Sequence, residues 1–378
     1  MASPGPSTGT PGLFETLRTD FRKTFGDARR TGYGRTVSQT VDDLESYYLT
    51  DASRRALAEM NAFKRFFVRS WWLFKALVFK LAPGRRVLLA CGVIAVVLSI
   101  VQVRGVAQGH SHWTLIGLAC ILLVLMLELR EKLVAHDELA EGRAIQKALL
   151  PKAAPSIAGF DIWLDTTPAN DVGGDIVDVL QANDDRFFLL LGDVAGKGLG
   201  AALLAARLQA TFRALAPDSS TLAEVGARLN RIFCRDGPSN RFATIVALAG
   251  RPGHPTLRVM NAGHPAALLS RSGEVSPLPP GGPALGIVAG AVYSEHAVTL
   301  APGDTLVVYS DGATEAMNAE GQLFGEERLV SALQAHGHAP VAELGARLKS
   351  IVRDFEGAAR PHDDLSLIIV RKGDGSHS

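Results

Sequence analysis

The chain has 378 residues and a formal net charge of +1, with 39 Lys and Arg residues against 38 Asp and Glu residues. This near-neutral balance, without a basic groove, gives no indication of nucleic-acid binding. The chain has three cysteines. Two of them, Cys91 and Cys120, lie inside apolar runs, which argues against a disulfide framework. The composition then changes sharply along the chain.

Residues 1–62 are predicted to form an N-terminal cytoplasmic segment that is partly disordered, because residues 1–11 are rich in Pro, Gly and Ser. No signal peptide is expected, since the first apolar run begins far from Met1. Residues 63–86 mix aromatic side chains with bases, among them Trp71 and Lys75. This pattern predicts a basic amphipathic helix that lies on the inner membrane surface.

Two apolar runs, residues 87–103 and 113–129, contain Glu128 as their only charge. At about 17 residues each, they are near the lower limit for helices that span a bilayer. Buried core helices are the alternative, but the runs lie outside any plausible globular domain. Bases flank the pair on both outer sides, whereas the link between the runs holds only Arg104. The positive-inside rule then predicts two transmembrane helices in the cell inner (cytoplasmic) membrane, with both termini in the cytoplasm.

Residues 130–150 are rich in Glu, Lys, Leu and Ala, and are predicted to continue the second span as a signalling or linker helix. Leu129 and Leu133 begin a heptad pattern, but His136 and Arg143 stand where the seam needs apolar residues. A homodimer that forms through this helix is therefore an open expectation.

Residues 151–372 show the pattern of a layered α/β (α+β) domain, followed by a disordered tail over 373–378. Several strands are apolar throughout, which indicates burial on both faces, and helices and strands come in blocks. This favours sheets covered by helices over a doubly wound parallel sheet. Strands are predicted over residues 160–165, 186–191, 241–249, 256–260, 266–269, 305–309 and 365–370, and helices over 201–215, 223–234, 326–335 and 341–355.

Four short acidic motifs are spread along this domain. Each alone is ordinary turn chemistry, because Asp next to Gly is common in turns. Together at the rim of a core, however, carboxylates repel one another and their pKa values rise, so divalent cations are needed to neutralise them. The set predicts a two-metal hydrolase. The motifs are Gly173-Gly174-Asp175, Gly192-Asp193-Val194, Ser310-Asp311-Gly312 and Asp363-Asp364.

In this order, the motifs resemble the catalytic domain of the metal-dependent type 2C (PPM) serine/threonine protein phosphatases, in the bacterial SpoIIE/RsbU branch. The resemblance covers about residues 149–371 and implies a β-sandwich flanked by helices, with the metal ions between the sheets. The matching segments are Leu149-Leu150-Pro151, Asp171-Val172-Gly173-Gly174-Asp175 with Asp178, Gly192-Asp193-Val194-Ala195-Gly196-Lys197-Gly198, Asn261-Ala262-Gly263-His264-Pro265, Ser310-Asp311-Gly312-Ala313-Thr314-Glu315 and Asp363-Asp364-Leu365-Ser366.

The resemblance implies that Asp193 bridges two Mn²⁺ or Mg²⁺ ions and that the Val194 carbonyl supplies a further oxygen. Asp175 would hold one ion, and Asp311 with Asp363 the other. Spacing leaves open whether Asp363 or Asp364 is the ligand, and the family pattern favours the first. Oxygen ligands without a His or Cys cluster fit these hard ions better than Zn²⁺. The implied reaction is hydrolysis of phosphoserine or phosphothreonine by a metal-activated water, without a covalent phosphoenzyme.

Four further residues are weaker candidates for contacts around the metal ions or the substrate. Gly174 allows close approach of a ligand, and Asp178 either orients water around the metal ions or caps a turn. The eukaryotic relatives carry a proton-donating His where this chain has Ala195, so the general acid is open. His264 and Lys197 are candidates, although His264 is more simply explained as a hydrogen-bonded core residue.

By resemblance, the substrate is a phosphorylated anti-sigma-factor antagonist (an anti-anti-sigma, STAS-type protein), and the reaction belongs to partner-switching regulation of a sigma factor. The linker helix would couple an upstream signal to the metal site. One alternative is a catalytically silent pseudophosphatase that only binds its partner. A nucleotide cyclase is a weaker alternative, because Ile176 and Val177 stand where such enzymes carry Glu-Phe after the Gly-Gly pair.

Overall fold

The computed structural model describes residues 60–103, 112–151, 156–169, 172–182, 185–238, 241–359 and 361–373. The predictions for residues 1–59, for the link at 104–111, for Asp171 and for the tail beyond residue 373 lie outside this part. The chain divides into two compact units, Met1–Glu131 and Lys132–Ser378.

Three helices account for the described part of the first unit: α4 (Ala62–Lys80), α5 (Pro83–Val103) and the beginning of α6 (His112–Leu149). The Asn61 side chain caps α4 by accepting a hydrogen bond from the Lys64 amide. Aromatic side chains along α4, including Trp71, are exposed. This helix lies where the sequence predicted the basic amphipathic helix.

Helices α5 and α6 contact each other within the first unit. The Arg85 guanidinium donates to Glu128 at 2.7 Å and to Glu131 at 2.5 Å. A Cβ atom added to Gly117 would lie 2.6 Å from the Gly92 carbonyl oxygen, so the two backbones meet where neither residue has a side chain. Glu128, the one charge of the predicted second span, is therefore paired.

Among the described residues, one helical stretch, His112–Val134, is long and apolar enough to cross a membrane. It contains the second predicted span. The first predicted span is helical within α5, but α5 is not such a candidate among the described residues. Helix α5 has 21 residues and opens with Pro83-Gly84-Arg85-Arg86, so its apolar run is about 17 residues long, near the lower limit for a span. The structure thus supports one candidate span where the sequence predicted two, and it does not show a transmembrane hairpin or a multi-pass topology.

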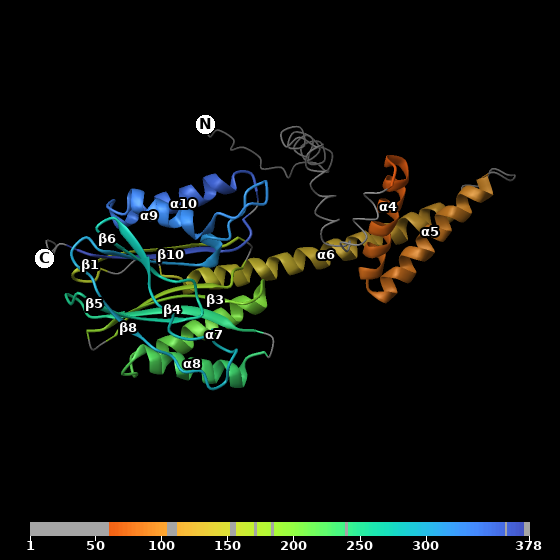
Figure 1. Ribbon diagram of the computed structural model, residues 1–378. Helices are drawn as coiled ribbons and strands as arrows, with labels where there is room; N and C mark the ends of the chain where they lie inside the picture. The colour runs from red at the N-terminus through yellow and green to blue at the C-terminus, as the bar shows by residue number, and fades with distance from the viewer. Residues whose placement is uncertain are drawn as a thin grey trace, which may run out of the picture. The chain divides into compact units, whose positions relative to one another are not determined.

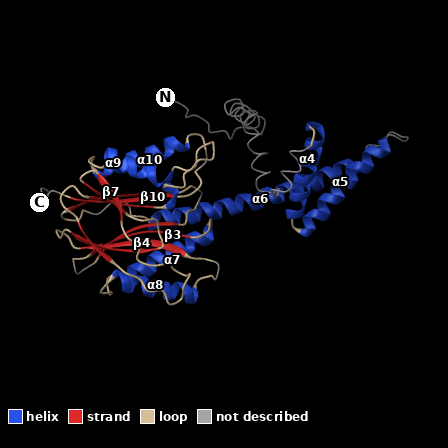
Figure 2. Cartoon of the chain, viewed as in Figure 1, coloured by secondary structure: helices blue, strands red, loops and turns tan. Residues whose placement is uncertain are grey.

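The second unit is built from two five-stranded sheets, with strand orders β1-β10-β9-β6-β7 and β2-β3-β4-β5-β8. Every ladder between neighbouring strands is antiparallel. Figure 2 shows the two sheets as separate layers. The strands are β1 (Phe160–Thr167), β2 (Asp175–Gln181), β3 (Phe187–Val194), β4 (Ala243–Gly250), β5 (Thr256–Ala262), β6 (Leu268–Arg271), β7 (Glu274–Pro277), β8 (His296–Thr299), β9 (Thr305–Tyr309) and β10 (Leu365–Lys372).

Helices α7 (Leu199–Leu215) and α8 (Leu222–Asp236) cover the β2-containing sheet, and α9 (Gly325–His336) and α10 (Val341–Glu356) cover the other (Figure 1). Each central strand is buried on both faces, which explains its apolar runs. In β3, Leu189 and Leu191 face the second sheet, whereas Phe188 and Leu190 pack under α7 and α8. The predicted helix-covered α+β sandwich is confirmed.

The sequence did not predict three of the strands. Strands β7 and β8 have four residues each and pair on one side only, so they carry little of the apolar pattern that marks a buried strand. Strand β2 is the important omission, because its first residue, Asp175, was interpreted as part of a turn motif. The carboxylate is therefore carried by a strand rather than by a turn.

Candidate active site

Strand register places Asp175 beside Asp193. The two residues are direct cross-strand partners in the β2–β3 ladder. Side chains alternate along a strand, so Asp175 shares a face with Val177, and Asp193 shares a face with Leu191. Val177 and Leu191 belong to the core between the two sheets. Both carboxylates therefore lie at one end of the sandwich, on its inner side.

The other sheet brings its acidic motifs to the same end. Asp311 follows β9 and Asp364 precedes β10, and these antiparallel neighbours place the end of one strand at the start of the other. The Ser310 hydroxyl donates to the Asp364 carbonyl at 2.8 Å. The Ser366 hydroxyl donates to the Asp175 carboxylate at 2.5 Å, which links the two sheets across the site.

Glycines permit the close approach of these segments. A Cβ atom on Gly174 would lie 2.8 Å from both Asp193 Oδ1 and the Val194 carbonyl oxygen. On Gly312 it would lie 2.1 Å from the Asp364 carbonyl oxygen. Contacts below 3 Å leave no room for a side chain, so packing requires glycine at positions 174 and 312.

Burial and mutual repulsion raise the pKa values of the clustered carboxyl groups. Burial, followed by the charges of Asp311 and Asp363, raises the pKa of Asp193 to about 7. Burial also raises the pKa of Asp175 well above its usual value. The pKa of Asp311 is raised by burial and by Asp363. Several carboxylates that disfavour their own charged forms make a site that cations would stabilise.

The donor chemistry fits Mg²⁺ or Mn²⁺, because the available ligands are carboxylate and carbonyl oxygens. Within the described ranges, no three Asp, Glu, His or Cys side chains already surround a common point as the ligands of one ion would. By their chemistry and charge, the residues present nevertheless fit hard divalent cations.

The contacts of Asp363 and Asp364 differ. The Asp364 carboxylate accepts a hydrogen bond from the Ala169 amide at 2.8 Å and a longer one from the Asp175 amide at 3.5 Å. Its side chain thus holds the backbone around the Gly-Gly pair. The Asp363 side chain is 38% exposed and lies 3.8 Å from Lys197 Nζ. These contacts favour Asp363 as the ligand and Asp364 as the residue that shapes the loop.

Asp178 and His264 are each held by hydrogen bonds to groups other than the clustered carboxylates. Asp178 lies on the helix-facing side of β2 and binds the Arg213 guanidinium through both oxygens, at 2.6 and 2.7 Å. His264 is buried between Thr244 Oγ1 at 2.8 Å and the Tyr309 carbonyl oxygen at 3.0 Å. Burial lowers the pKa of His264 to about 4. Both residues therefore have structural partners, and His264 is neutral at physiological pH.

Lys197 lies at the rim of the cluster. Its ammonium group donates to the His362 carbonyl at 2.9 Å and is 3.8 Å from Asp363. The lysine joins the loop after β3 to the segment before β10. Of the weaker candidates that carry a titratable side chain, Lys197 is the one whose contacts keep it beside the acidic motifs.

Gln146, near the end of α6, contacts the site although no motif contains it. Its amide nitrogen donates to the Gly173 carbonyl at 2.8 Å, and its amide oxygen accepts from the Gly173 N–H at 3.1 Å. Gln209 of α7 donates to the Leu149 carbonyl at 3.1 Å. A single Gln in a polar helix has no sequence signal for such a contact, because the contact depends on where the helix docks.

A family model described as "Stage II sporulation protein E (SpoIIE)" matches residues 183–373, just over half of the chain. Protein IcfG from Synechocystis sp. is 26% identical over 261 residues, which cover 62% of this chain and 41% of that protein. The phosphoserine phosphatase RsbP from Bacillus subtilis is 24% identical over 247 residues, which cover 63% and 59% of the two chains. The chain thus spans less than two thirds of the length of these curated relatives.

Two solved structures share the fold. The SiaA-PP2C domain of Pseudomonas aeruginosa superposes with a TM-score of 0.57 at 22% identity, over 64% of this chain and 98% of that one. The RsbU and RsbW domains of a Mycobacterium tuberculosis protein give a TM-score of 0.51 at 23% identity, over 58% and 61%. At these identities, the likeness establishes the fold of the second unit.

Proposed function

This chain belongs to the SpoIIE family, in the SpoIIE/RsbU branch of the PPM-type protein phosphatases, and from that premise we propose that it hydrolyses phosphoserine or phosphothreonine in a protein substrate. The observation that carries the proposal is the convergence of Asp175, Asp193, Asp311 and Asp363 at one end of the sandwich. The curated relatives are longer, so the activity of the whole chain is part of the proposal.

We propose that Asp193 is shared between two Mn²⁺ or Mg²⁺ ions, with Asp175 on one side and Asp311 and Asp363 on the other, and with the Val194 carbonyl as a further ligand. Bound there, such ions would supply charge neutralisation for the phosphoryl group and an activated water nucleophile. Ser366 would hold Asp175 in place through its hydroxyl, and Asp364 would keep the Gly-Gly loop close to Asp193.

The proton for the departing serine oxygen is proposed to come from water rather than from a histidine. Ala195 has no titratable group, and His264 is buried, with both ring nitrogens engaged and its pKa lowered to about 4. Lys197 remains beside Asp363. Its proposed role is to attract the phosphate dianion through its positive charge.

The test is phosphate release by the full-length chain from p-nitrophenyl phosphate and from a phosphoserine peptide, with Mn²⁺, with Mg²⁺ and with EDTA. Turnover is expected with either ion, and none with EDTA, because without the ions the carboxylates would repel the phosphate. A folded protein that binds Mn²⁺ and the phosphopeptide but releases no phosphate would instead support a pseudophosphatase.

For the first unit, we propose a membrane anchor in which α5 and α6 cross the inner membrane as a hairpin with both ends in the cytoplasm. The apolar stretch His112–Val134 supports one span. The Arg85 ion pairs and the contact between Gly92 and Gly117 support the pairing of α5 with α6. The exposed aromatic residues of α4, interspersed with bases, suit a helix on the inner lipid surface.

The proposed substrate is a phosphorylated anti-anti-sigma protein of the STAS type, in a partner-switching pathway that controls a sigma factor. Support comes from the family and from the relative named as a phosphoserine phosphatase, RsbP. A homodimer through α6 stays a proposal, because the heptad pattern of residues 129–143 is broken by His136 and Arg143.

We also propose that α6 influences the metal site through Gln146. Its paired hydrogen bonds with Gly173 fix the loop that carries Gly174 and Asp175. Gln146→Ala is therefore expected to raise the Mn²⁺ concentration for half-maximal activity by up to about thirtyfold, since two hydrogen bonds of about 1 kcal/mol each are lost. Turnover at saturating Mn²⁺ should change less.

The matched control is Glu141→Gln on an exposed position of the same helix. Metal titrations of both variants, followed by turnover and by Mn²⁺ binding, separate a positioning effect from simple loss of fold. If Gln146→Ala and Glu141→Gln give the same Mn²⁺ dependence as the parent chain, α6 does not act through this contact.

A further inference from the structure

A cavity of about 450 Å³ lies at the end of the sandwich opposite the acidic motifs. It lies over a part of the β2-containing sheet that α7 and α8 cover only in part. The row Leu190, Ala247 and Met260 lies under α7 and α8, whereas the next row contains Phe188, Ala249 and Arg258. Residues 216–221, which connect α7 to α8, lie above that next row and leave a hollow there.

The base of this cavity is apolar. Phe188, Ala216, Leu222, Val225 and Ala249 line it, and four of them belong to the core under the helices. The Phe188 ring packs edge-on against Phe212 of α7, with the ring centroids 6.4 Å apart. The floor is preformed but almost fully buried, with Phe188 2% exposed, and the Arg186 guanidinium covers the Phe188 ring, so a ligand would lie against Arg186 above the floor.

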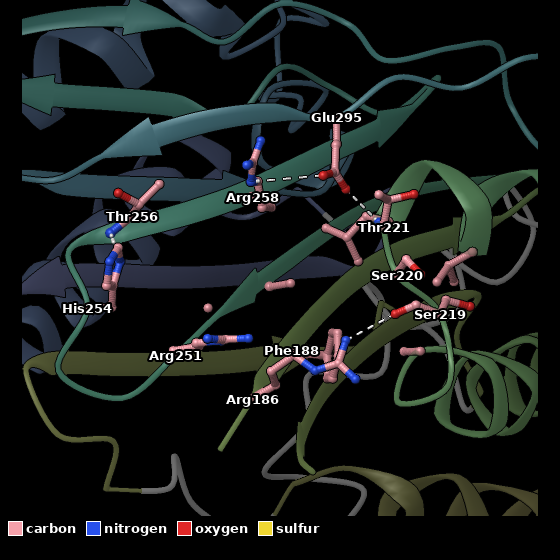
Figure 3. Close-up of a pocket in the computed structure, with 15 residues that line it drawn as sticks. Arg186, Phe188, Ser219, Ser220, Thr221, Arg251, His254, Thr256, Arg258 and Glu295 are labelled. Carbon is pink, nitrogen blue, oxygen red and sulfur yellow. Dashed lines mark hydrogen bonds and ion pairs between the residues drawn. The ribbon is translucent and has the colours of Figure 1, made fainter. Parts of the chain in front are cut away.

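Arginines stand around this floor. Arg251 comes from the β4–β5 turn and Arg258 from β5, and Arg186 precedes β3 (Figure 3). The Arg186 guanidinium donates to the Ser219 carbonyl at 3.0 Å and to the Pro217 carbonyl, and it lies over the Phe188 ring. In Figure 3, Arg251 and His254 face Ser219 and Thr221 across the cavity.

The positive charges of two of these arginines, Arg251 and Arg258, are not neutralised by a close carboxylate of any described residue. Within the described part of the chain, Arg251 accepts a backbone hydrogen bond from the His254 amide at 3.1 Å, but its side chain makes no hydrogen bond or ion pair. Arg258 has one carboxylate partner there, Glu295, at the long distance of 3.9 Å. Glu295 itself accepts a hydrogen bond from the Leu222 amide at 2.6 Å. The rim thus carries more positive than negative charge, and its guanidinium groups suit the oxygens of a phosphate.

The N-terminus of α8 does not supply hydrogen-bond donors for an anion in the cavity. Thr221 caps the helix by accepting from the Glu224 amide at 3.2 Å, and Glu295 takes the Leu222 amide. The first turn of α8 is therefore already satisfied, and any anion selectivity would come from the arginine side chains.

We propose that this cavity binds a small organic phosphate, whose phosphate group pairs with Arg251 and Arg258 and whose planar or apolar part lies above the floor, where the Arg186 guanidinium covers the Phe188 ring. The site is separate from the acidic cluster. Asp193 lies five residues beyond Phe188 along β3, which corresponds to about 17 Å along the strand. The proposal does not depend on the phosphatase activity, because no residue of the acidic cluster lines the cavity.

Isothermal titration calorimetry of the full-length chain in EDTA tests this, with AMP, adenosine and inorganic phosphate as separate probes. EDTA keeps metal ions out of the acidic cluster, so that cluster offers no phosphate site. AMP is expected to bind one site, and more tightly than adenosine or inorganic phosphate. Arg251→Gln and Arg258→Gln should each weaken AMP binding by at least about tenfold, because each removes a charge-assisted contact.

Two further variants make the test specific. Glu295→Gln keeps an acceptor for the Leu222 amide and removes the negative charge, so it should strengthen AMP binding severalfold. Arg347→Gln removes an arginine from α10, where it pairs with Glu343, and should leave binding unchanged. Thermal melts of each variant without ligand verify folding. No AMP binding at millimolar concentration, or equal binding by Arg251→Gln, Arg258→Gln and the parent chain, would overturn the proposal.

Discussion

Asp193→Asn is expected to lower the Mn²⁺-dependent turnover of the full-length chain by at least about 10³-fold, because the residue proposed to be shared by both ions loses its charge. Asparagine keeps nearly the same shape, so the fold should survive. The measurement is phosphate release from a phosphoserine peptide at saturating Mn²⁺, with a Mn²⁺ titration to show whether excess ion restores any activity.

Asp178→Asn is the matched control for this prediction. Asp178 lies on β2, three residues from Asp175, but its carboxylate faces α7 and binds Arg213. Loss of its charge should lower thermal stability, since the buried Asp178 carboxylate accepts two hydrogen bonds from the half-exposed Arg213 guanidinium. Turnover below the melting temperature should stay within a few-fold of the parent chain. Equal loss of turnover in both variants would contradict the assignment of the acidic cluster as the active site.

Metal-free protein is expected to lose stability as the pH rises from about 4 to about 7. The folded-state pKa of Asp193 is raised from 3.8 to about 7, so in this window the folded state binds more protons than the unfolded state. The free energy of unfolding therefore decreases with rising pH and levels off above the folded-state pKa. For Asp193 alone, the decrease should be about 1–3 kcal/mol, because partial exposure reduces the 1.36 kcal/mol per pKa unit.

Denaturant unfolding in EDTA at a series of pH values measures this slope. Asp193→Asn should flatten it and make the metal-free protein more stable than the parent chain above pH 7. Saturating Mn²⁺ should do the same for the parent chain, because bound cations neutralise the carboxylates. A stability that rises between pH 4 and 7 in EDTA, or one that Asp193→Asn leaves unchanged, would show that the carboxylates are not strained in the folded state.

Site residues could be assigned from the sequence where the neighbouring strand was predicted correctly. The buried run before Asp311 was predicted to within a residue, because β9 is apolar on both faces and its neighbours cover both. Strand β2 was missed, since it begins inside the acidic motif. Because this strand was not predicted, the alternation of its side chains could not be used to separate Asp178 from Asp175. Both residues therefore stayed candidates. Once β2 is known, a spacing of three residues places the two carboxylates on opposite faces.

The sequence by itself determined the family, the helix-covered sandwich and the identity of the acidic residues. These depend on local patterns: apolar runs between turns, and Asp beside Gly in a particular order. The tertiary structure alone decided which carboxylates meet, because Asp175 and Asp193 are joined by register between strands. It also revealed the Gln146 contact and the arginine-lined cavity. Both arise where separate elements pack, and packing between distant segments leaves no periodic signal in the chain.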